Sequence, residues 1–277
     1  MIDIIRVFPQ RTSHTPDDKF VYIGRPLFSE MLPDVDEAHI SCCFSWDKNY
    51  AEKLAWEWGR YYKVKIGGPA FGNVIPEFKP GFYLKNGITI TTRGCNNKCW
   101  FCEVPRREGK LQLIDEIIPG YMVNDNNLLQ APRSHIEKVF DMLRSQNRGI
   151  VFSGGLDARE IDEEIVRFLQ SIKIRKIFLA YDDTANYKYM KSASRLLNWL
   201  DRRKLGCYVL VGYKGDSQIK AEKRLADMWH LGFLPFAMAY RGPHDPKIPS
   251  PLWAALVRKW RRPIAIYNEM SAHAFDD

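Results

Sequence analysis

The chain has little cysteine for its 277 residues: six in all, three of them within eight residues, at Cys95, Cys99 and Cys102. It also lacks a long apolar run, because the longest, Leu231–Tyr240, is about half of what a bilayer span needs. The N-terminus lacks a charged region followed by a long apolar one, which argues against secretion. We therefore expect a cytoplasmic protein that does not bind a membrane and has no disulfide framework.

The sequence also lacks a long uninterrupted stripe of one charge, although its formal net charge is +8. The basic excess lies in four short clusters: Arg106, Arg107 and Lys110; Lys173, Arg175 and Lys176; Arg202, Arg203 and Lys204; Arg258, Lys259, Arg261 and Arg262. Such a balance suits a polyanionic partner such as tRNA or another nucleic acid. The alternative is a set of solvated helix ends, where the helix dipole favours cations.

From about Asn86 onward, short β-rich runs alternate with helical patterns. The runs start at Gly87, Gly120, Gly149, Lys176, Cys207 and Phe233. Successive starts are roughly 30 residues apart, the length of one strand plus a crossover helix, and the runs are apolar on both faces. Six β/α units predict an α/β fold with a parallel sheet, a partial (β/α)6 barrel of the TIM type. In such a fold, chemistry collects at the carboxyl ends of the strands.

Polar residues mark the expected helix starts. Ser134 and Glu137 form a capping-box pair, and Asp157, Thr184 and Asp216 each precede a run with helical spacing. Ser250 followed by a proline predicts a further helix over 251–260.

Residues 1–85 have a different pattern and predict a small N-terminal α/β region, followed by a barrel domain over 86–277. Within it, Glu37–Phe44 and Tyr62–Gly68 resemble parallel strands around a helix that carries Leu54 and Trp58. Proline, glycine and asparagine are frequent over 67–82, which we interpret as the linker between the N-terminal region and the barrel domain.

The three clustered cysteines lack a nearby fourth. A closed structural zinc site normally takes four ligands in two pairs. The other cysteines, Cys42, Cys43 and Cys207, lie in strand-like apolar runs, where a free thiol usually behaves as a small buried hydrophobe. Three thiolates in one short loop can hold three irons of a [4Fe-4S] cluster and leave the fourth iron open to an outside ligand.

The stretch "GCNNKCWFC", Gly94–Cys102, resembles the radical S-adenosylmethionine signature, C-x3-C-x-aromatic-C, in the loop after the first strand of a β/α barrel. The resemblance covers about Ile88–Tyr240. It implies that Cys95, Cys99 and Cys102 each bind one iron of a [4Fe-4S] cluster, while S-adenosyl-L-methionine chelates the fourth.

In that family the reduced cluster cleaves S-adenosylmethionine to methionine and a 5′-deoxyadenosyl radical, which abstracts hydrogen from a substrate. The resemblance therefore implies an enzyme that receives electrons from a donor such as flavodoxin or ferredoxin. It also implies that Phe101 packs near the adenine; otherwise the ring covers the cluster and excludes water.

Further strand-end residues match the family less closely. Asp125, Asn126 and Asn127 resemble polar residues that hold the aminoacyl end of the cofactor. Ser153 and Gly154, in "FSGGLD", resemble the glycine-glycine-acid motif of the family. That motif usually follows the second strand, whereas this stretch follows the third. The alternative interpretation of the two glycines is an ordinary tight turn. Asp182 lies where an acidic residue of the family contacts the ribose hydroxyls or the methionine amine of the cofactor. Gly212 lies in a segment that resembles the adenine-contact segment of the family, although the usual glutamate of that segment is missing here. A helix-capping aspartate is the alternative in both segments.

The layout is most similar to the cobalamin-associated and methylthiotransferase branches, but it lacks their accessory motifs. No D-x-H-x-x-G cobalamin signature occurs, and only Cys42 and Cys43 precede the motif. The chain is therefore expected to be a minimal enzyme with one cluster. Three hypotheses for its action remain open: modification of a nucleic acid or nucleobase, action on a peptide or small molecule, and a metal-binding module without catalysis.

Overall fold

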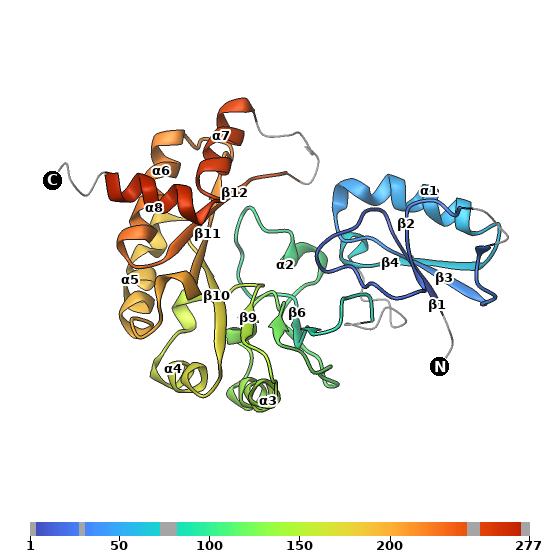
Figure 1. The fold of residues 1–277 in the computed structure, drawn as a ribbon, viewed down its shortest axis with the longest axis horizontal. Coiled ribbons are helices and arrows are strands. Elements are labelled where there is room, and N and C mark those ends of the chain that lie inside the picture. The colour runs from blue at the N-terminus through green and yellow to red at the C-terminus, as the bar shows by residue number, and fades with distance from the viewer. Residues whose placement is uncertain (1–3, 28–30, 73–81, 243–249, 273–277) are drawn as a thin grey trace. The chain divides into compact units, whose positions relative to one another are not determined.

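The computed structural model describes residues 4–27, 31–72, 82–242 and 250–272. Its strands are β1 (Ile4–Phe8), β2 (Val21–Ile23), β3 (Glu37–Ser41), β4 (Lys63–Gly67), β5 (Ile88–Thr89), β6 (Thr92–Arg93), β7 (Gln112–Leu113), β8 (Met122–Val123), β9 (Ile150–Phe152), β10 (Ile174–Ala180), β11 (Leu205–Val211) and β12 (Leu234–Ala239). Its α-helices are α1 (Lys48–Trp58), α2 (Val104–Arg107), α3 (Arg133–Arg144), α4 (Glu163–Gln170), α5 (Tyr187–Leu196), α6 (Gln218–His230), α7 (Pro251–Lys259) and α8 (Pro263–Ala272) (Figure 1).

These strands form three sheets, with the orders β2-β1-β3-β4, β12-β11-β10-β9-β8-β5 and β6-β7. In the six-stranded sheet, neighbours follow one another in the sequence, and the pairs from β8 to β12 are parallel. An α/β fold with a parallel sheet is therefore confirmed. Helices fill the connections between successive strands, as parallel pairing requires.

The chain divides into two compact units, Met1–Gly120 and Tyr121–Asp277, and each is described by itself. The boundary expected near residue 85 lies within the first unit. Part of the expected linker, 73–81, lies outside the described residues. No helix within the described ranges is long and apolar enough to cross a membrane.

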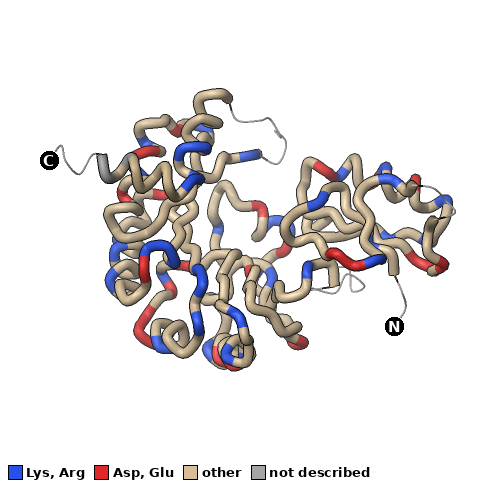
Figure 2. Tube along the Cα trace, viewed as in Figure 1, with Lys and Arg blue, Asp and Glu red and all other residues tan. Residues whose placement is uncertain are grey.

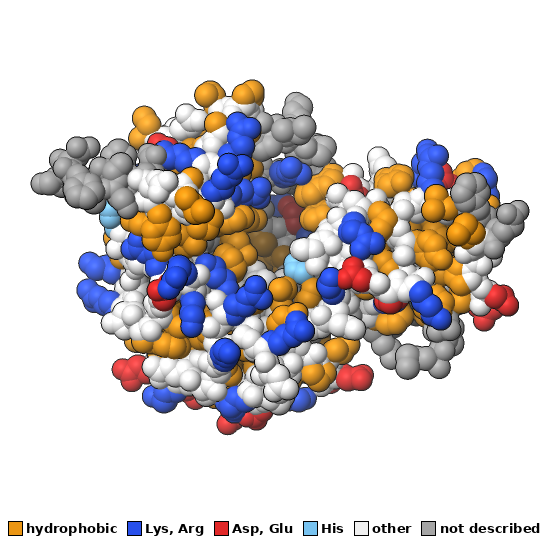
Figure 3. All heavy atoms as spheres, in the orientation of Figure 1, with side chains coloured by type: hydrophobic (Ala, Val, Ile, Leu, Met, Phe, Trp, Pro, Cys, Tyr) orange, Lys and Arg blue, Asp and Glu red, His pale blue; other side chains and the backbone are white. Residues whose placement is uncertain are grey.

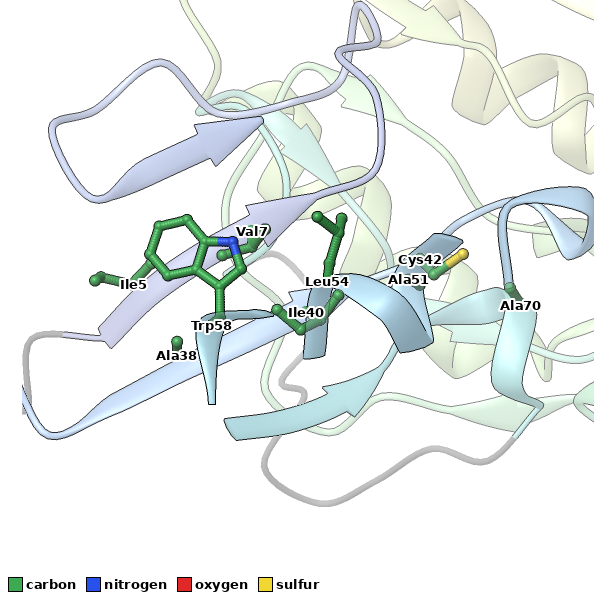
Figure 4. Close-up of a cluster of buried hydrophobic side chains, with 9 residues drawn as sticks. All are labelled: Ile5, Val7, Ala38, Ile40, Cys42, Ala51, Leu54, Trp58 and Ala70. Atoms are coloured by element: carbon green, nitrogen blue, oxygen red, sulfur yellow. The ribbon is translucent and has the colours of Figure 1, made fainter. Parts of the chain in front are cut away.

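In the first unit, the four-stranded parallel sheet packs one face against α1. The buried cluster on this face combines side chains of β1, β3 and α1 (Figure 4). Its members are Ile5, Val7, Ala38, Ile40, Cys42, Ala51, Leu54, Trp58 and Ala70. The predicted strand and helix over 37–58 are confirmed, whereas β1 and β2 were missed by the sequence analysis, which treated the N-terminus only as a candidate leader.

In the second unit, alternate residues of the long strands face the helices. On β10, Ile177 and Leu179 are fully buried, while Phe178 between them is only partly buried. The same alternation on β11 buries Val209 and leaves Tyr208 partly exposed. Helix α6 packs on β11 and β12, and α3–α6 lie on one side of the strands (Figure 1). One face of the sheet thus carries the core, and the other bears partly exposed aromatic rings.

Several expected helix starts were wrong, because the residues expected to cap the helices do not do so. Helix α3 begins after Pro132 with no side-chain cap, so Ser134 and Glu137 form no capping box. Asp157 caps only a short 3-10 turn, and the cap of α4 is Asp162.

The expected starts of α5 and α6 were displaced in the same way. Asp183, not Thr184, caps the 3-10 turn that precedes α5. Helix α6 has Ser217 as its cap, while Asp216 pairs with Arg224. The helix expected after Ser250 does begin there, although the Ser250 side chain makes no cap hydrogen bond.

The strand expected at "GITITTR" is in fact two short strands in different sheets. Strand β5 belongs to the six-stranded sheet and β6 pairs antiparallel with β7. The break falls at Ile90–Thr91, because the Thr91 carbonyl accepts a hydrogen bond of 2.9 Å from Ile114 N, on the segment that returns from the cysteines.

Candidate functional site

The segment that carries the three cysteines, 94–111, is called the cysteine loop here and belongs to the first unit. The short β6–β7 ladder closes it, with Thr92 opposite Leu113 and Arg93 opposite Gln112. Because an antiparallel ladder brings both ends of a loop together, the ladder closes the base of this loop. The cysteines therefore lie on the long loop that connects the two strands of the β6–β7 hairpin, and not inside a sheet.

Polar contacts near its base hold the loop closed. Arg93 Nη2 lies 2.7 Å from Glu108 Oε1, and both side chains are largely buried, 17% and 5% exposed. Gly94 N donates to the other carboxylate oxygen of Glu108 at 3.2 Å. Gly94 has φ +74°, and a Cβ there would lie 2.1 Å from the Lys110 carbonyl oxygen, so this position requires glycine. The glycine of the motif thus serves the closure of the loop.

The three thiols differ in exposure. Cys99 is exposed, whereas Cys95 and Cys102 are partly buried. Asn97 N donates to Cys95 Sγ at 3.4 Å, the kind of hydrogen bond that stabilises a thiolate or a metal-bound sulfur. Burial raises the pKa of the Cys102 thiol, and the nearby Arg107 opposes this shift. Phe101 is partly buried and meets the ring of Trp100 edge-on, with centroids 5.4 Å apart.

The cysteines are not assembled into a metal site as they stand. Among the residues that the structure describes, no three His, Cys, Asp or Glu side chains converge closely enough to hold a metal ion. The donor set fits a cluster in its chemistry, with three sulfurs on one loop and an N–H already directed at one of them. Binding would require the three thiols to move closer together.

In the second unit, the ends of β8 and β9 meet closely. Ser153 Oγ lies 3.1 Å from both the Val123 carbonyl oxygen and Asn124 Oδ1. A Cβ on Gly154 would lie 1.9 Å from the Asp125 carbonyl oxygen. The Gly154 backbone therefore approaches the neighbouring strand end, which accounts for the glycine without a ligand.

The remaining residues after β8 are mostly buried. Asp125 is 2% exposed and Asn127 is 5% exposed, while Asn126 is partly exposed. Asn127 Nδ2 donates to Asp157 Oδ2 at 3.2 Å, so it ties the end of β8 to the turn after β9. The structure thus brings the sequence-predicted residues of these two strand ends together, and the side chains of Ser153 and Asn127 join the strand ends.

Asp182 and Gly212, at the ends of β10 and β11, form a second group. Asp182 Oδ1 accepts a hydrogen bond of 2.7 Å from Leu210 N, so it caps backbone and not a helix. Burial raises the pKa of Asp182 to about 6, against the opposing effects of that hydrogen bond and of Arg224. Gly212 has φ +79° and donates to Asp216 Oδ2 at 2.9 Å.

Asp216 forms a buried ion pair with Arg224, with 2.9 Å between Arg224 Nη2 and Asp216 Oδ2. The Arg224 side chain is 3% exposed and the Asp216 side chain is 0% exposed. Arg224 also donates to the Leu210 carbonyl oxygen at 2.9 Å. Leu210 therefore links Asp182 to the Asp216–Arg224 pair through its backbone. The sequence analysis placed Asp216 at a helix start, and its real partner, Arg224, lies two turns along α6.

Three aromatic rings on the open face of the sheet were missed by the sequence analysis. Phe178 stacks on Tyr208 with ring centroids 4.4 Å apart and planes 5° apart, and Tyr208 meets Phe236 edge-on at 5.8 Å. Tyr208 Oη donates to the Ser153 carbonyl oxygen at 3.2 Å, and burial raises the Tyr208 pKa to about 12, so the phenol is neutral. The signal available in the sequence was the period-2 alternation of β10 to β12, which sets these rings opposite the core residues.

Within the described residues of the second unit, the Lys and Arg positions do not form a single stripe along the chain trace (Figure 2). On the second unit they are spread over the helices and mixed with Asp and Glu (Figure 2). The visible face of that unit also shows separate blue groups rather than one continuous patch (Figure 3). Two tryptophans of α1 differ in exposure: Trp58 belongs to the core, while Trp56 is 65% exposed and its ring centroid lies 4.0 Å from Arg60 Cζ.

Comparison with known proteins adds no relative: no family model matches the chain, and a search of curated proteins finds no significant match.

Proposed function

We propose that this chain is a radical S-adenosylmethionine enzyme, and that its cysteine loop binds one [4Fe-4S] cluster. The observation that carries the proposal is the spacing C-x3-C-x2-C on a closed loop with no fourth thiol. When bound, such a cluster supplies the electron that cleaves S-adenosylmethionine to methionine and a 5′-deoxyadenosyl radical. The final reaction on a substrate is left open by this proposal.

The chain's own residues have distinct roles in this proposal. Cys95, Cys99 and Cys102 supply the three sulfurs, and the Asn97 N–H stabilises negative charge on the first of them. The pair Arg93–Glu108 and the positive φ of Gly94 hold the base of the loop, so that only its tip needs to move. Phe101 would cover the cluster or pack against the adenine.

The sheet supports a partial barrel of the TIM type. Its sequential order, its parallel pairing and its helices on one side are the features of such a barrel. The strand-end residues Asn126, Ser153, Asp182 and Gly212 would then lie at its carboxyl edge, with Asp125 and Asn127 supporting them. In this proposal they bind S-adenosylmethionine.

Anaerobic reconstitution with iron and sulfide tests the proposal, followed by dithionite, S-adenosylmethionine and detection of 5′-deoxyadenosine. The wild-type protein should bind about four irons and form 5′-deoxyadenosine, and Cys99→Ser should lose both. Cys207→Ala is the matched control, because burial raises the pKa of the Cys207 thiol well above its usual value and makes it a poor ligand. Iron without 5′-deoxyadenosine would favour the metal-binding module instead.

The positive charge favours a nucleic acid as the substrate of this enzyme, with a peptide or small molecule as the second candidate. Filter binding of tRNA at increasing salt separates the two. A steep loss of affinity with salt is expected for a nucleic-acid substrate, whereas no affinity at low salt would remove it.

A further inference from the structure

The strands β9, β10 and β11 are parallel neighbours in the six-stranded sheet and begin at the same edge (Figure 1). The segments that lead into them are 144–149, 171–176 and 197–204, and we call the surface that they form the basic edge. Together they contain eight Lys and Arg residues and one Asp, a formal net charge of +7. Two of the four basic clusters of the sequence, 173–176 and 202–204, therefore meet in the fold.

Hydrogen bonds join the three segments of the basic edge to one another. Lys176 Nζ donates to the Arg203 carbonyl oxygen at 2.7 Å, which connects the second segment to the third. Arg144 Nη1 donates to Ser171 Oγ at 3.0 Å, which connects the first segment to the second. The cations of the three segments therefore belong to one surface of the second unit.

The opposite ends of the same three strands carry the opposite charge. The segments that follow them, 153–162, 181–186 and 212–217, contain six Asp and Glu residues and two Lys and Arg residues, a formal net charge of −4. Helix dipoles favour this distribution, because the helices end at the basic edge and begin at the other one. Each helix end contributes only about half a charge, so the ends of α3, α4 and α5 supply about −1.5 against the +7 of the basic edge.

Carboxylates of the chain pair with few of these cations. Within the described residues, the ion pairs at the basic edge are that of Arg144 with Asp141 and that of Arg203 Nε with Asp201 Oδ1, at 2.9 Å. Three exposed cations of this edge form neither an ion pair nor a side-chain hydrogen bond with the described part of the chain: Lys173, Arg175 and Lys204. Much of the positive charge is therefore available to an outside partner.

A polymer with regularly spaced negative charges fits this surface. Double-helical nucleic acids carry one phosphate charge per about 3.4 Å of each strand. Neighbouring β-strands lie about 4.8 Å apart, so cations on three adjacent segments can contact several phosphates of one chain at the same time. A small anion would contact one or two of these cations and leave the others without a partner.

Trp199 distinguishes between classes of polyanion. It lies in segment 197–204, is 40% exposed, and is the one large apolar side chain that these three segments expose. Such a ring can stack on an unpaired base, which an acidic peptide does not offer. Binding at a membrane surface would bury several apolar side chains, and the basic edge exposes one.

We propose that the basic edge binds the phosphate backbone of a nucleic acid, with the Trp199 ring stacked on an unpaired base. Strand β10 has seven residues and is therefore about 23 Å long, at about 3.3 Å per residue. A nucleic acid that is held at the basic edge and also reaches the carboxyl ends of the strands must then be a polymer and not a mononucleotide. This last step rests on the function proposed above, whereas binding at the basic edge does not.

Filter binding of tRNA to the full-length protein at increasing salt tests the proposal. Combining Lys173→Glu, Arg175→Glu and Lys204→Glu should weaken binding at least about tenfold at low salt, and the slope of log affinity against log salt should become about 2 less steep. The matched control makes the same change in net charge on exposed lysines of two helices of this unit and should cost about threefold or less, because distant charges are screened. Its substitutions are Lys188→Glu, Lys191→Glu and Lys220→Glu.

A single substitution tests the base contact. Trp199→Ala should weaken binding of single-stranded RNA about fivefold and leave binding of duplex RNA unchanged, because paired bases offer no free face. Trp56→Ala removes a more exposed ring from the first unit and should change neither affinity. An unchanged affinity of Trp199→Ala for single-stranded RNA would overturn the base contact.

The proposal fails if the wild-type protein has no salt-dependent affinity for tRNA, or if the two triple variants lose affinity equally. It also fails if polyglutamate, AMP, or vesicles of phosphatidylcholine and phosphatidylserine displace labelled tRNA as well as unlabelled tRNA does. Thermal unfolding checks that the variants are folded, and the same three residues changed to Gln give a milder version with the same expected direction.

The iron cluster provides a separate readout. After anaerobic reconstitution, both triple variants should form 5′-deoxyadenosine at the wild-type rate, because they change neither the cysteine loop nor the strand ends assigned to S-adenosylmethionine. A protein that binds tRNA at the basic edge but forms no 5′-deoxyadenosine would contradict the function proposed above and leave this inference standing.

Discussion

The cysteine loop of the first unit and the strand ends of the second use their polar residues in opposite ways. In the loop, the closing side-chain contact is the pair of Arg93 with Glu108, which also accepts from Gly94 N, and Cys99 is exposed. At the strand ends, Ser153, Asn127 and Asp182 bond neighbouring strands and turns. A polar residue at the carboxyl end of a strand can therefore be needed first for the fold, whereas the exposed Cys99 lies on a loop that other residues close.

The largest expected effect concerns the buried pair at the end of β11. Arg224→Met would leave the buried Asp216 carboxylate without its cation, and we expect a loss of about 3–5 kcal/mol in the free energy of unfolding. Arg203→Met removes an exposed pair with Asp201 and should cost less than about 0.5 kcal/mol. Urea denaturation measures both. Similar costs for the two variants would contradict the structural role given to this strand end.

The next effect tests the close approach of β8 and β9. Gly154→Ala would place a Cβ against the Asp125 carbonyl and should cost about 3 kcal/mol, because two strand ends must separate. Gly155→Ala has φ +93° but no close neighbour, so we expect only the backbone strain of about 1–2 kcal/mol. If Gly154→Ala proves the milder variant in urea denaturation, the glycine is there for another reason.

The third effect is the pH dependence that arises from Asp182. Its folded-state pKa of about 6 lies above the ordinary value of 3.8, so its stabilising contribution is complete below about pH 4 and is lost as the pH rises through 6. The difference in free energy of unfolding between Asp182→Asn and wild type should therefore shift in favour of the variant by about 2–3 kcal/mol from pH 4 to pH 8. Thermal unfolding across that range measures the gain. A difference that does not change with pH would show that this carboxyl titrates normally.

The smallest effect is expected on the other side of the comparison. Cys99 is exposed, so Cys99→Ser should change the free energy of unfolding by less than about 0.5 kcal/mol. Urea denaturation of the protein without iron measures this change. A loss of 2 kcal/mol or more would mean that the loop is part of the structural core and not a site held apart from it.

The sequence predicted the parallel sheet well because spacing and apolar runs report how strands and helices alternate along the chain. It predicted β3, α1 and β4 for the same reason. It did not predict that "GITITTR" splits into two strands. The antiparallel partner of β6 is β7, which lies about twenty residues further along the chain and has a weak strand pattern of its own. Helix starts were misplaced where two acidic or hydroxyl residues stood close together, as with Asp157 and Asp162, since either can cap a helix.

Within the candidate site, the cysteines could be singled out from spacing alone, because three thiols so close together have few other uses. The roles of Asp182 and Gly154 could not be predicted, because the same residue type at a strand end can contact either a ligand or neighbouring backbone. Tyr208 was missed because an aromatic residue inside an apolar strand gives no sign of which face it occupies until the register is known.

In the proposed enzyme, three thiols hold the iron cluster and leave one coordination position open. Electron paramagnetic resonance of the reconstituted, dithionite-reduced protein tests it most directly, with and without S-adenosylmethionine. We expect a signal of a reduced [4Fe-4S] cluster that changes when S-adenosylmethionine is added, because the added molecule would bind the open iron. A cluster signal that S-adenosylmethionine leaves unchanged, or no cluster signal at all, would contradict it.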